Sequence, residues 1–200
     1  MYYTTMKNMH RTFIAIPVSD DAKVALAPLV RQLEEQMPVG AFRFLDPESW
    51  HITLSFLGDQ SDEEVGQVVS ALPSVVPMLG MPQEVRFERL AYWPDAENPS
   101  ALVVVGDGAA SAALGEVREI LEDGLIAHEV RFRPDNRRFT AHITVAKRTK
   151  ESVLLPELDM PIDVICVPEL VEYLESYSQK GESRYEVLAG EPVTGEGVIE

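Results

Sequence analysis

The chain has 200 residues and a net charge of −16 from 33 acidic and 17 basic residues, and this length suits one domain with a sizeable apolar core. The acidic balance argues against a protein that coats long duplex nucleic acid by counterion release. The single cysteine excludes an intramolecular disulfide, and no apolar run is long enough for a signal peptide or a membrane span, so we expect a monomeric cytoplasmic protein with no membrane partner.

The first half of the chain predicts strands and helices in alternation. Branched and aromatic residues with a period of two indicate strands, and a period near 3.6 indicates helices. Ser61 and Glu64 form a capping-box pattern that starts the second helix. In chain order we predict strand 11–18, helix 19–37, strand 42–45, a turn at 46–49, strand 52–57 and helix 61–72.

The second half repeats this order, which we interpret as an internal duplication. We predict strands 83–93 and 101–107, helix 109–124 ended by Gly124, strand 142–147, further strand in 162–178 and 183–190, and a hairpin around 179–183. Because short strands often follow one another directly, we expect an α+β fold with two lobes and mixed or antiparallel sheets. The domain is predicted to span 11–190, with 1–10 and 191–200 as loose tails.

Two predicted strands carry the same motif, HITLSF at 51–56 and HITVAK at 142–147. Chance gives about 0.16 His-x-Thr for this composition, so two matched copies point to function. Side chains alternate along a strand, so each strand should bury one face and present the histidine and threonine on the other. The expected polar faces hold His51, Thr53 and Ser55 in the first strand and His142, Thr144 and Ala146 in the second.

Two imidazoles that face each other across a cleft can act as general acid and general base near pH 7. The two threonine hydroxyls can donate hydrogen bonds to the oxygens of an anion whose charge redistributes. Phosphodiester hydrolysis without a metal fits this set. A zinc site is the competing interpretation, but neither motif has a second ligand at metal-binding spacing, so we expect no cofactor. The structural alternative is that both histidines are ordinary half-buried strand residues.

The basic and acidic residues of the second half are unevenly distributed. Residues 131–150 hold seven basic residues and one acid, whereas 151–200 hold twelve acids and two basic residues. This contrast indicates a local cationic site for a small anion or for one end of a polymer, with an exposed basic loop as the alternative. We interpret His10 and His128 as surface residues and Cys166 as a core residue.

The segments HITLSFLGD and HITVAKR resemble the paired motifs of the two-histidine phosphoesterases, in particular the RNA 2′,3′-cyclic phosphodiesterases, also called 2′-5′ RNA ligase-like proteins. RTFIAIPVSD, FRFLDPESW and GESRYEVL extend the resemblance over nearly the whole chain. It implies a bilobal fold in which two pseudo-twofold-related sheets with flanking helices surround a central cleft. It also implies metal-independent opening of a 2′,3′-cyclic phosphate, at an RNA 3′ end or in a small cyclic nucleotide, to a 2′-phosphate.

By this resemblance His51 would protonate the leaving 3′ oxygen, His142 would activate water, and Thr53 and Thr144 would hold the phosphate. Spacing alone leaves the acid and base roles exchangeable. By the same resemblance, Phe56 is expected to pack in the core rather than to stack on a base.

The chain departs from the family pattern beside the second motif. Lys147 stands where the family usually has an arginine, and a lysine lacks the planar fork that grips two phosphate oxygens. Arg148, which we expect on the face of His142, could substitute for it. Ala141 stands where a proline is usual. The alternatives in function are 2′-5′ ligation of tRNA halves and a non-catalytic module that binds nucleotides or RNA ends.

Overall fold

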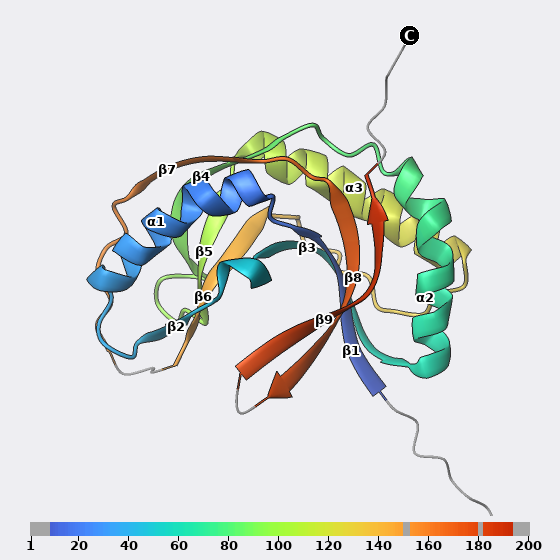
Figure 1. The fold of residues 1–200 in the computed structure, drawn as a ribbon, viewed down its shortest axis with the longest axis horizontal. Coiled ribbons are helices and arrows are strands. Elements are labelled where there is room, and N and C mark those ends of the chain that lie inside the picture. Colours follow the sequence, from blue (N-terminus) through green and yellow to red (C-terminus); the bar gives the residue numbers. More distant parts are fainter. Residues whose placement is uncertain (1–8, 150–152, 180–181, 194–200) are drawn as a thin grey trace, which may run out of the picture.

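The computed structural model describes residues 9–149, 153–179 and 182–193 (Figure 1). The predicted helices and strands are present, several with longer ends. In chain order the elements are β1 (Met9–Pro17), α1 (Asp20–Gln36), β2 (Phe42–Phe44), the 3₁₀ turn η1 (Pro47–Ser49), β3 (His51–Ser61), α2 (Asp62–Val75), the 3₁₀ turn η2 (Val76–Met78), β4 (Val85–Trp93), β5 (Ala101–Gly106), α3 (Gly108–Ala127), β6 (His142–Arg148), β7 (Pro161–Cys166), β8 (Leu170–Gln179) and β9 (Glu182–Pro192).

The described strands form one curved sheet in the order β7-β4-β5-β6-β3-β1-β8-β9, with β2 added beside β6. All of the pairings are antiparallel. The two halves of the sheet meet where β3 pairs with β6 through Ile52 and Ile143. On either side of this seam the order is alike, since β1, β8 and β9 flank β3 as β5, β4 and β7 flank β6. The expected two lobes are therefore two halves of one sheet.

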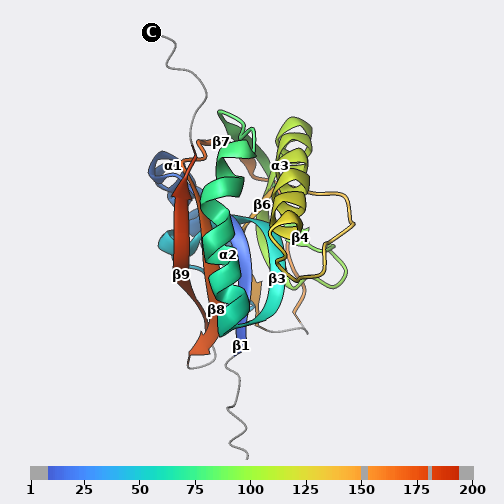
Figure 2. The same cartoon turned by 90° about the vertical axis from the view of Figure 1, so that its right-hand side faces the viewer.

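The helices lie on the outer side of the sheet, where α1 packs beside β7 and α2 packs against α3 (Figures 1 and 2). The main apolar core lies between sheet and helices and includes Ile52, Ile143 and Cys166, each fully buried. The interpretation of Cys166 as a core residue is confirmed. Two smaller apolar clusters lie apart from this core, one around Phe13 and one around Val103.

The predicted end of the helix at Gly124 is wrong, because α3 continues to Ala127. A Cβ at Gly124 would lie 2.8 Å from a Val75 methyl, so this glycine allows α2 and α3 to approach closely. The helix ends instead before Glu129, which adopts a left-handed φ of 62°. The amide of Val130 then donates to the carbonyl of Leu125, which closes the last turn.

The predicted tails are too long at both ends. Met9 and His10 belong to β1, and the His10 ring contacts Asp62 at 2.8 Å and Glu175 at 2.9 Å. At the other end β9 continues through Pro192. The remaining tail residues 1–8 and 194–200, and the centre of the predicted hairpin at 180–181, lie outside the described residues. Within the described chain, each helix is too short or too polar to cross a membrane.

Candidate active site

The four residues of the two motifs lie together on one face of the sheet. Ile52 and Ile143 form the residue pair of the seam and point into the core. Their neighbours along each strand therefore point to the opposite face, and an antiparallel register sets each histidine beside the threonine of the other strand. The side chains placed there are those of His51, Thr53, His142 and Thr144, all partly buried.

The two imidazoles are oriented in the same way. Nδ1 of His51 lies 2.8 Å from the carbonyl oxygen of Ser49, and Nδ1 of His142 lies 2.8 Å from that of Thr140. Because a carbonyl oxygen can only accept, Nδ1 carries the proton and donates in both rings. Each neutral ring therefore keeps an unprotonated Nε2, which can take up a proton as a base and return it as an acid.

Aromatic rings pack on both histidines. Phe13 and Tyr185 lie on the His51 ring with centroid distances of 5.0 Å each, and the Tyr185 ring meets it edge-on at 84°. Trp93 stacks on His142 with a centroid distance of 4.6 Å and an interplanar angle of 17°. These contacts restrict the rotation of both imidazoles and exclude water from one side of each ring.

This setting favours neutral imidazoles in the free protein. The pKa of His51 is lowered to about 4, chiefly by burial and further by the charges of Lys147 and His142, against the hydrogen bond to Ser49 that raises it. Burial also lowers the pKa of His142 from its usual value of 6.5, opposed by the hydrogen bond to Thr140. The physical cause is that an imidazolium loses hydration when it is buried.

A one-residue β-bulge follows the threonine in each motif strand. Thr53 and Ser55 pair with consecutive residues of β1, so Leu54 is the extra residue. Thr144 and Ala146 likewise pair with consecutive residues of β5, so Val145 is the extra residue. A bulge places two successive residues on the same side and reverses the alternation beyond it.

The expected faces are therefore wrong beyond each threonine. Ser55 and Ala146 point to the buried side, where the Ser55 hydroxyl donates to Glu122 at 2.7 Å. Phe56 points to the face of the histidines, where it is 63% exposed and lies 5.9 Å from the ring of Phe13. The prediction that Phe56 packs in the core is wrong for this reason.

Lys147 and Arg148 are separated by the same reversal. The ammonium of Lys147 donates to Ser183 at 3.0 Å and to Tyr185 at 3.2 Å, beside His51. Arg148 lies on the opposite face, over the ring of Phe42 at 5.0 Å. The expectation that Arg148 shares a face with His142 is wrong.

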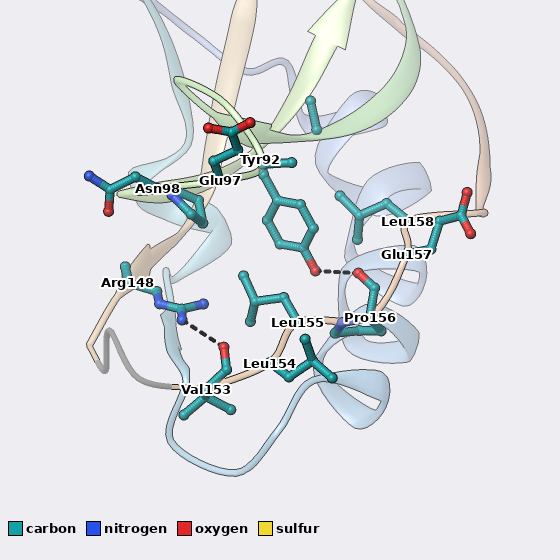
Figure 3. A pocket seen from close by; sticks show the side chains of 13 residues that line it. Tyr92, Glu97, Asn98, Arg148, Val153, Leu154, Leu155, Pro156, Glu157 and Leu158 are labelled. Carbon is teal, nitrogen blue, oxygen red and sulfur yellow. Dashed lines mark hydrogen bonds between the residues drawn. The ribbon is translucent and has the colours of Figure 1, made fainter.

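Arg148 lines a separate cavity of about 640 Å³ (Figure 3). There its guanidinium donates to the carbonyl of Val153 at 3.1 Å, and the Tyr92 hydroxyl donates to the carbonyl of Pro156 at 2.8 Å. None of the four motif residues lines this cavity. Arg148 is thus removed from the set of candidate phosphate-binding residues.

His51 lines a second cavity of about 640 Å³ between the β2–η1 segment and the β8–β9 hairpin. Arg43 lines it too, because β2 pairs with β6 and sets Arg43 opposite Lys147. Arg184 of β9 also contributes to its wall. The lining combines three basic residues with three acidic residues and three aromatic residues: Lys23, Arg43 and Arg184; Asp46, Glu48 and Glu172; and Phe44, Trp50 and Tyr185.

Sequence reasoning missed Trp93, Tyr185, Ser183 and Arg43. Their signal is absent from the local pattern, because β2, β4 and β9 are brought to the site by the order of the whole sheet. Trp93 and Tyr185 pack on the histidines, Ser183 binds Lys147, and Arg43 lines the cavity of His51. The tyrosine lies in the GESRYEVL segment, which resembles the family but carries no pattern that marks Tyr185 as a site residue.

The basic residues of 131–150 do not form one site in the described part of the chain. Lys147 and Arg148 lie on opposite faces, and the four arginines from 131 to 138 lie in the connection between α3 and β6. Arg137 is paired there with Asp135. The predicted cationic site is therefore divided at least between the two faces of β6.

The backbone N–H of Ala141, which a proline at this position would lack, makes a hydrogen bond. Its N–H donates to the hydroxyl of Ser111 at 3.1 Å, and its carbonyl accepts from Gly106 at 2.8 Å. These bonds fix the backbone just before His142. Among the described residues, no three His, Cys, Asp or Glu side chains are grouped as a metal site.

The chain resembles known phosphoesterases. The profile of the family described as LigT like Phosphoesterase matches residues 16–103. Two proteins named RNA 2′,3′-cyclic phosphodiesterase are similar to it. The one from Geobacillus stearothermophilus is 28% identical over 95% of this chain and 59% of that protein. The one from Archaeoglobus fulgidus is 25% identical over 88% of this chain and 86% of that protein. The chain thus spans about three fifths of the first relative and most of the second.

Two solved structures share the fold. E. coli LigT complexed with 3′-AMP superposes with a TM-score of 0.69 at 20% identity, over 94% of this chain and all of that one. TT0787 of Thermus thermophilus gives a TM-score of 0.70 at 20% identity over the same shares. The resemblance drawn from the two motifs and the expected bilobal α+β fold are confirmed.

Proposed function

We propose that this chain, a member of the LigT-like phosphoesterases, is a metal-independent RNA 2′,3′-cyclic phosphodiesterase that forms a 2′-phosphomonoester. The observation that carries the proposal is the matched pair of histidines on one face of the seam, each with Nδ1 bound to a backbone carbonyl. The names of the relatives support the substrate class.

In the proposed reaction His142 Nε2 takes a proton from water as the water oxygen bonds to phosphorus. The bond from phosphorus to the 3′ oxygen breaks, and this oxygen receives a proton from Nε2 of His51. One proton thus moves onto His142 and one leaves His51, and exchange with solvent restores both rings. The free imidazoles are neutral, and we propose that the bound phosphate anion raises the pKa of the ring that acts as the acid. Because the anion lies beside both rings, the acid and base roles of His51 and His142 can be exchanged.

Thr53 and Thr144 are proposed to donate hydrogen bonds to the non-bridging phosphate oxygens, since both lie on the face of the histidines. Lys147 is proposed to bind the same phosphate. Phe56 is exposed on this face and offers a ring on which a nucleobase can stack. Arg148 has no part in this proposal.

The test is hydrolysis of 2′,3′-cyclic AMP, and of a short RNA with a cyclic end, in buffer with EDTA, with the product phosphate located by ³¹P NMR. We expect a 2′-phosphate. His51→Ala and His142→Ala should each lower kcat roughly 10²- to 10⁴-fold. His128→Ala is the matched control, because His128 is an exposed residue at the end of α3.

Full turnover by both variants, or complete loss of activity in EDTA, would overturn the proposal. Incubation with tRNA halves tests the ligation alternative, in which joined product would accumulate. Calorimetry with 2′,3′-cyclic AMP tests the binding-module alternative, in which heat of binding would be seen without any product.

A further inference from the structure

Lys147 joins the two halves of the sheet. It belongs to β6, the strand that carries His142, yet its ammonium donates to Ser183 and Tyr185 of β9 at the far side of the His51 half. The two acceptors are alternate residues of one strand, so both hydroxyls lie on the same face of β9. An ammonium has three donors and can serve both acceptors with one left over.

Tyr185 in turn contacts His51. Its ring meets the imidazole edge-on at a centroid distance of 5.0 Å and meets Phe13 edge-on at 5.5 Å. The Lys147 ammonium also lies 5.7 Å from the centre of the Tyr185 ring. The phenol therefore has its ring against the catalytic imidazole and its oxygen on the ammonium, so a shift of either partner moves the other.

We propose that Ser183 and Tyr185 are positioning residues that hold the Lys147 ammonium beside His51 and fix the β8–β9 hairpin across the cleft. This inference rests on the proposed function for its effect on catalysis. Its effect on the ionisation of His51 in the free protein does not depend on that function.

The consequence is that two neutral hydroxyls set the electrostatic environment of His51. Lys147 and His142 act on the His51 charge from β6. Arg43 from β2, and Glu172 and Arg184 from the hairpin, line the same cavity as His51. Asp46 and Glu48 line the cavity too, together with Lys23. Burial raises the pKa of Glu172, while the charge of Lys23 lowers it. A released Lys147 would turn toward solvent, and His51 would then accept a proton more readily.

The test combines NMR titration of the His51 ring in the free protein with kinetics on 2′,3′-cyclic AMP. Tyr185→Phe keeps the ring against His51 and removes the oxygen, and Ser183→Ala removes the other acceptor. The double variant should raise the pKa of His51 by about half a unit and lower kcat severalfold. Lys147→Met should raise the pKa of His51 at least as much, whereas Lys147→Arg, which keeps the charge, should leave that pKa near the wild-type value.

The matched controls are Tyr177→Phe and Ser178→Ala, which make the same chemical changes on exposed positions of the same hairpin. Both should titrate and turn over as the wild type does. An unchanged His51 titration in the Ser183/Tyr185 double variant and in Lys147→Met would overturn the inference. If the pKa of His51 shifts as expected but neither the wild type nor any variant hydrolyses the substrate, the positioning role of Ser183 and Tyr185 stands and the proposed function fails.

Discussion

The pH dependence of kcat/KM tests the site most directly. The reaction needs one protonated and one neutral imidazole, and kcat/KM reports the ionisation of the free enzyme. The pKa of His51 is lowered to about 4, and that of His142 is lowered below 6.5. The pair carries a single proton between the two pKa values, so the optimum of kcat/KM should lie above about 4 and below the lowered pKa of His142. This is below the neutral optimum that two unperturbed histidines would give.

The size of the fall in kcat/KM at alkaline pH follows from the higher of the two pKa values, which lies below 6.5. Above the higher of the two pKa values the singly protonated fraction falls tenfold for each pH unit, so kcat/KM at pH 8 should be lower than its maximum by at least about 30-fold. The optimum of kcat should lie at higher pH, because a bound phosphate anion raises the pKa of both rings in the complex.

Initial rates with 2′,3′-cyclic AMP at constant ionic strength, between about pH 4 and pH 9, give both profiles. NMR titration of His51 and His142 in the free protein gives the ionisation of each ring separately. A kcat/KM that rises through pH 7 to a plateau, or a His51 ring that titrates at or above 6.5, would refute the reasoning from burial.

Three further outcomes are expected. Phe56→Ala should raise KM roughly 5- to 100-fold if a base stacks there, with unchanged urea unfolding because the ring is 63% exposed. Gly124→Ala should destabilise the fold by roughly 0–2 kcal/mol, as overpacking against Val75 exceeds the gain in helix propensity, and in a Val75→Ala background it should become stabilising. The hydrogen bonds to two carboxylates raise the pKa of His10. His10 therefore stabilises the fold fully below its pKa in the unfolded chain, and this stabilisation is lost as pH rises through its pKa in the folded protein. The difference in unfolding free energy between wild type and His10→Gln should accordingly shrink from pH 6 to pH 9.

The pattern of apolar residues was sufficient to predict the type and order of the elements, because periodicity reports the face that each element buries. The capping box of Ser61 and Glu64 placed the start of α2 correctly. Gly124 does not end the helix, because a glycine at this position is needed for the close approach of α2. The left-handed residue after α3 is Glu129 instead. The role of Gly124 is thus determined by the packing of α3 against α2, and the local sequence pattern around Gly124 carries no information about that contact.

The same limit applies to the site. The motif predicted that the two histidines and threonines share a face, because strand alternation holds over three residues. It failed beyond the threonines, where Leu54 and Val145 are inserted as bulges. A bulge is defined by the register with the partner strand, so a single strand's sequence does not reveal it. Trp93 and Tyr185 reach the histidines only through the strand order of the sheet.

The repeated bulge also explains how a symmetric frame yields two unlike histidines. In each motif strand it turns the fifth residue after the histidine back toward the cleft, and this residue is Phe56 in one strand and Lys147 in the other. The two matched motifs supply two imidazoles held in the same way, whereas the unlike residues supply an aromatic ring and a cation. Because the cation lies beside His51, it lowers the pKa of that ring and is not among the causes that shift His142. The difference in environment between the two histidines therefore originates outside the His-x-Thr motif, at a position that the bulge brings to their face of the sheet.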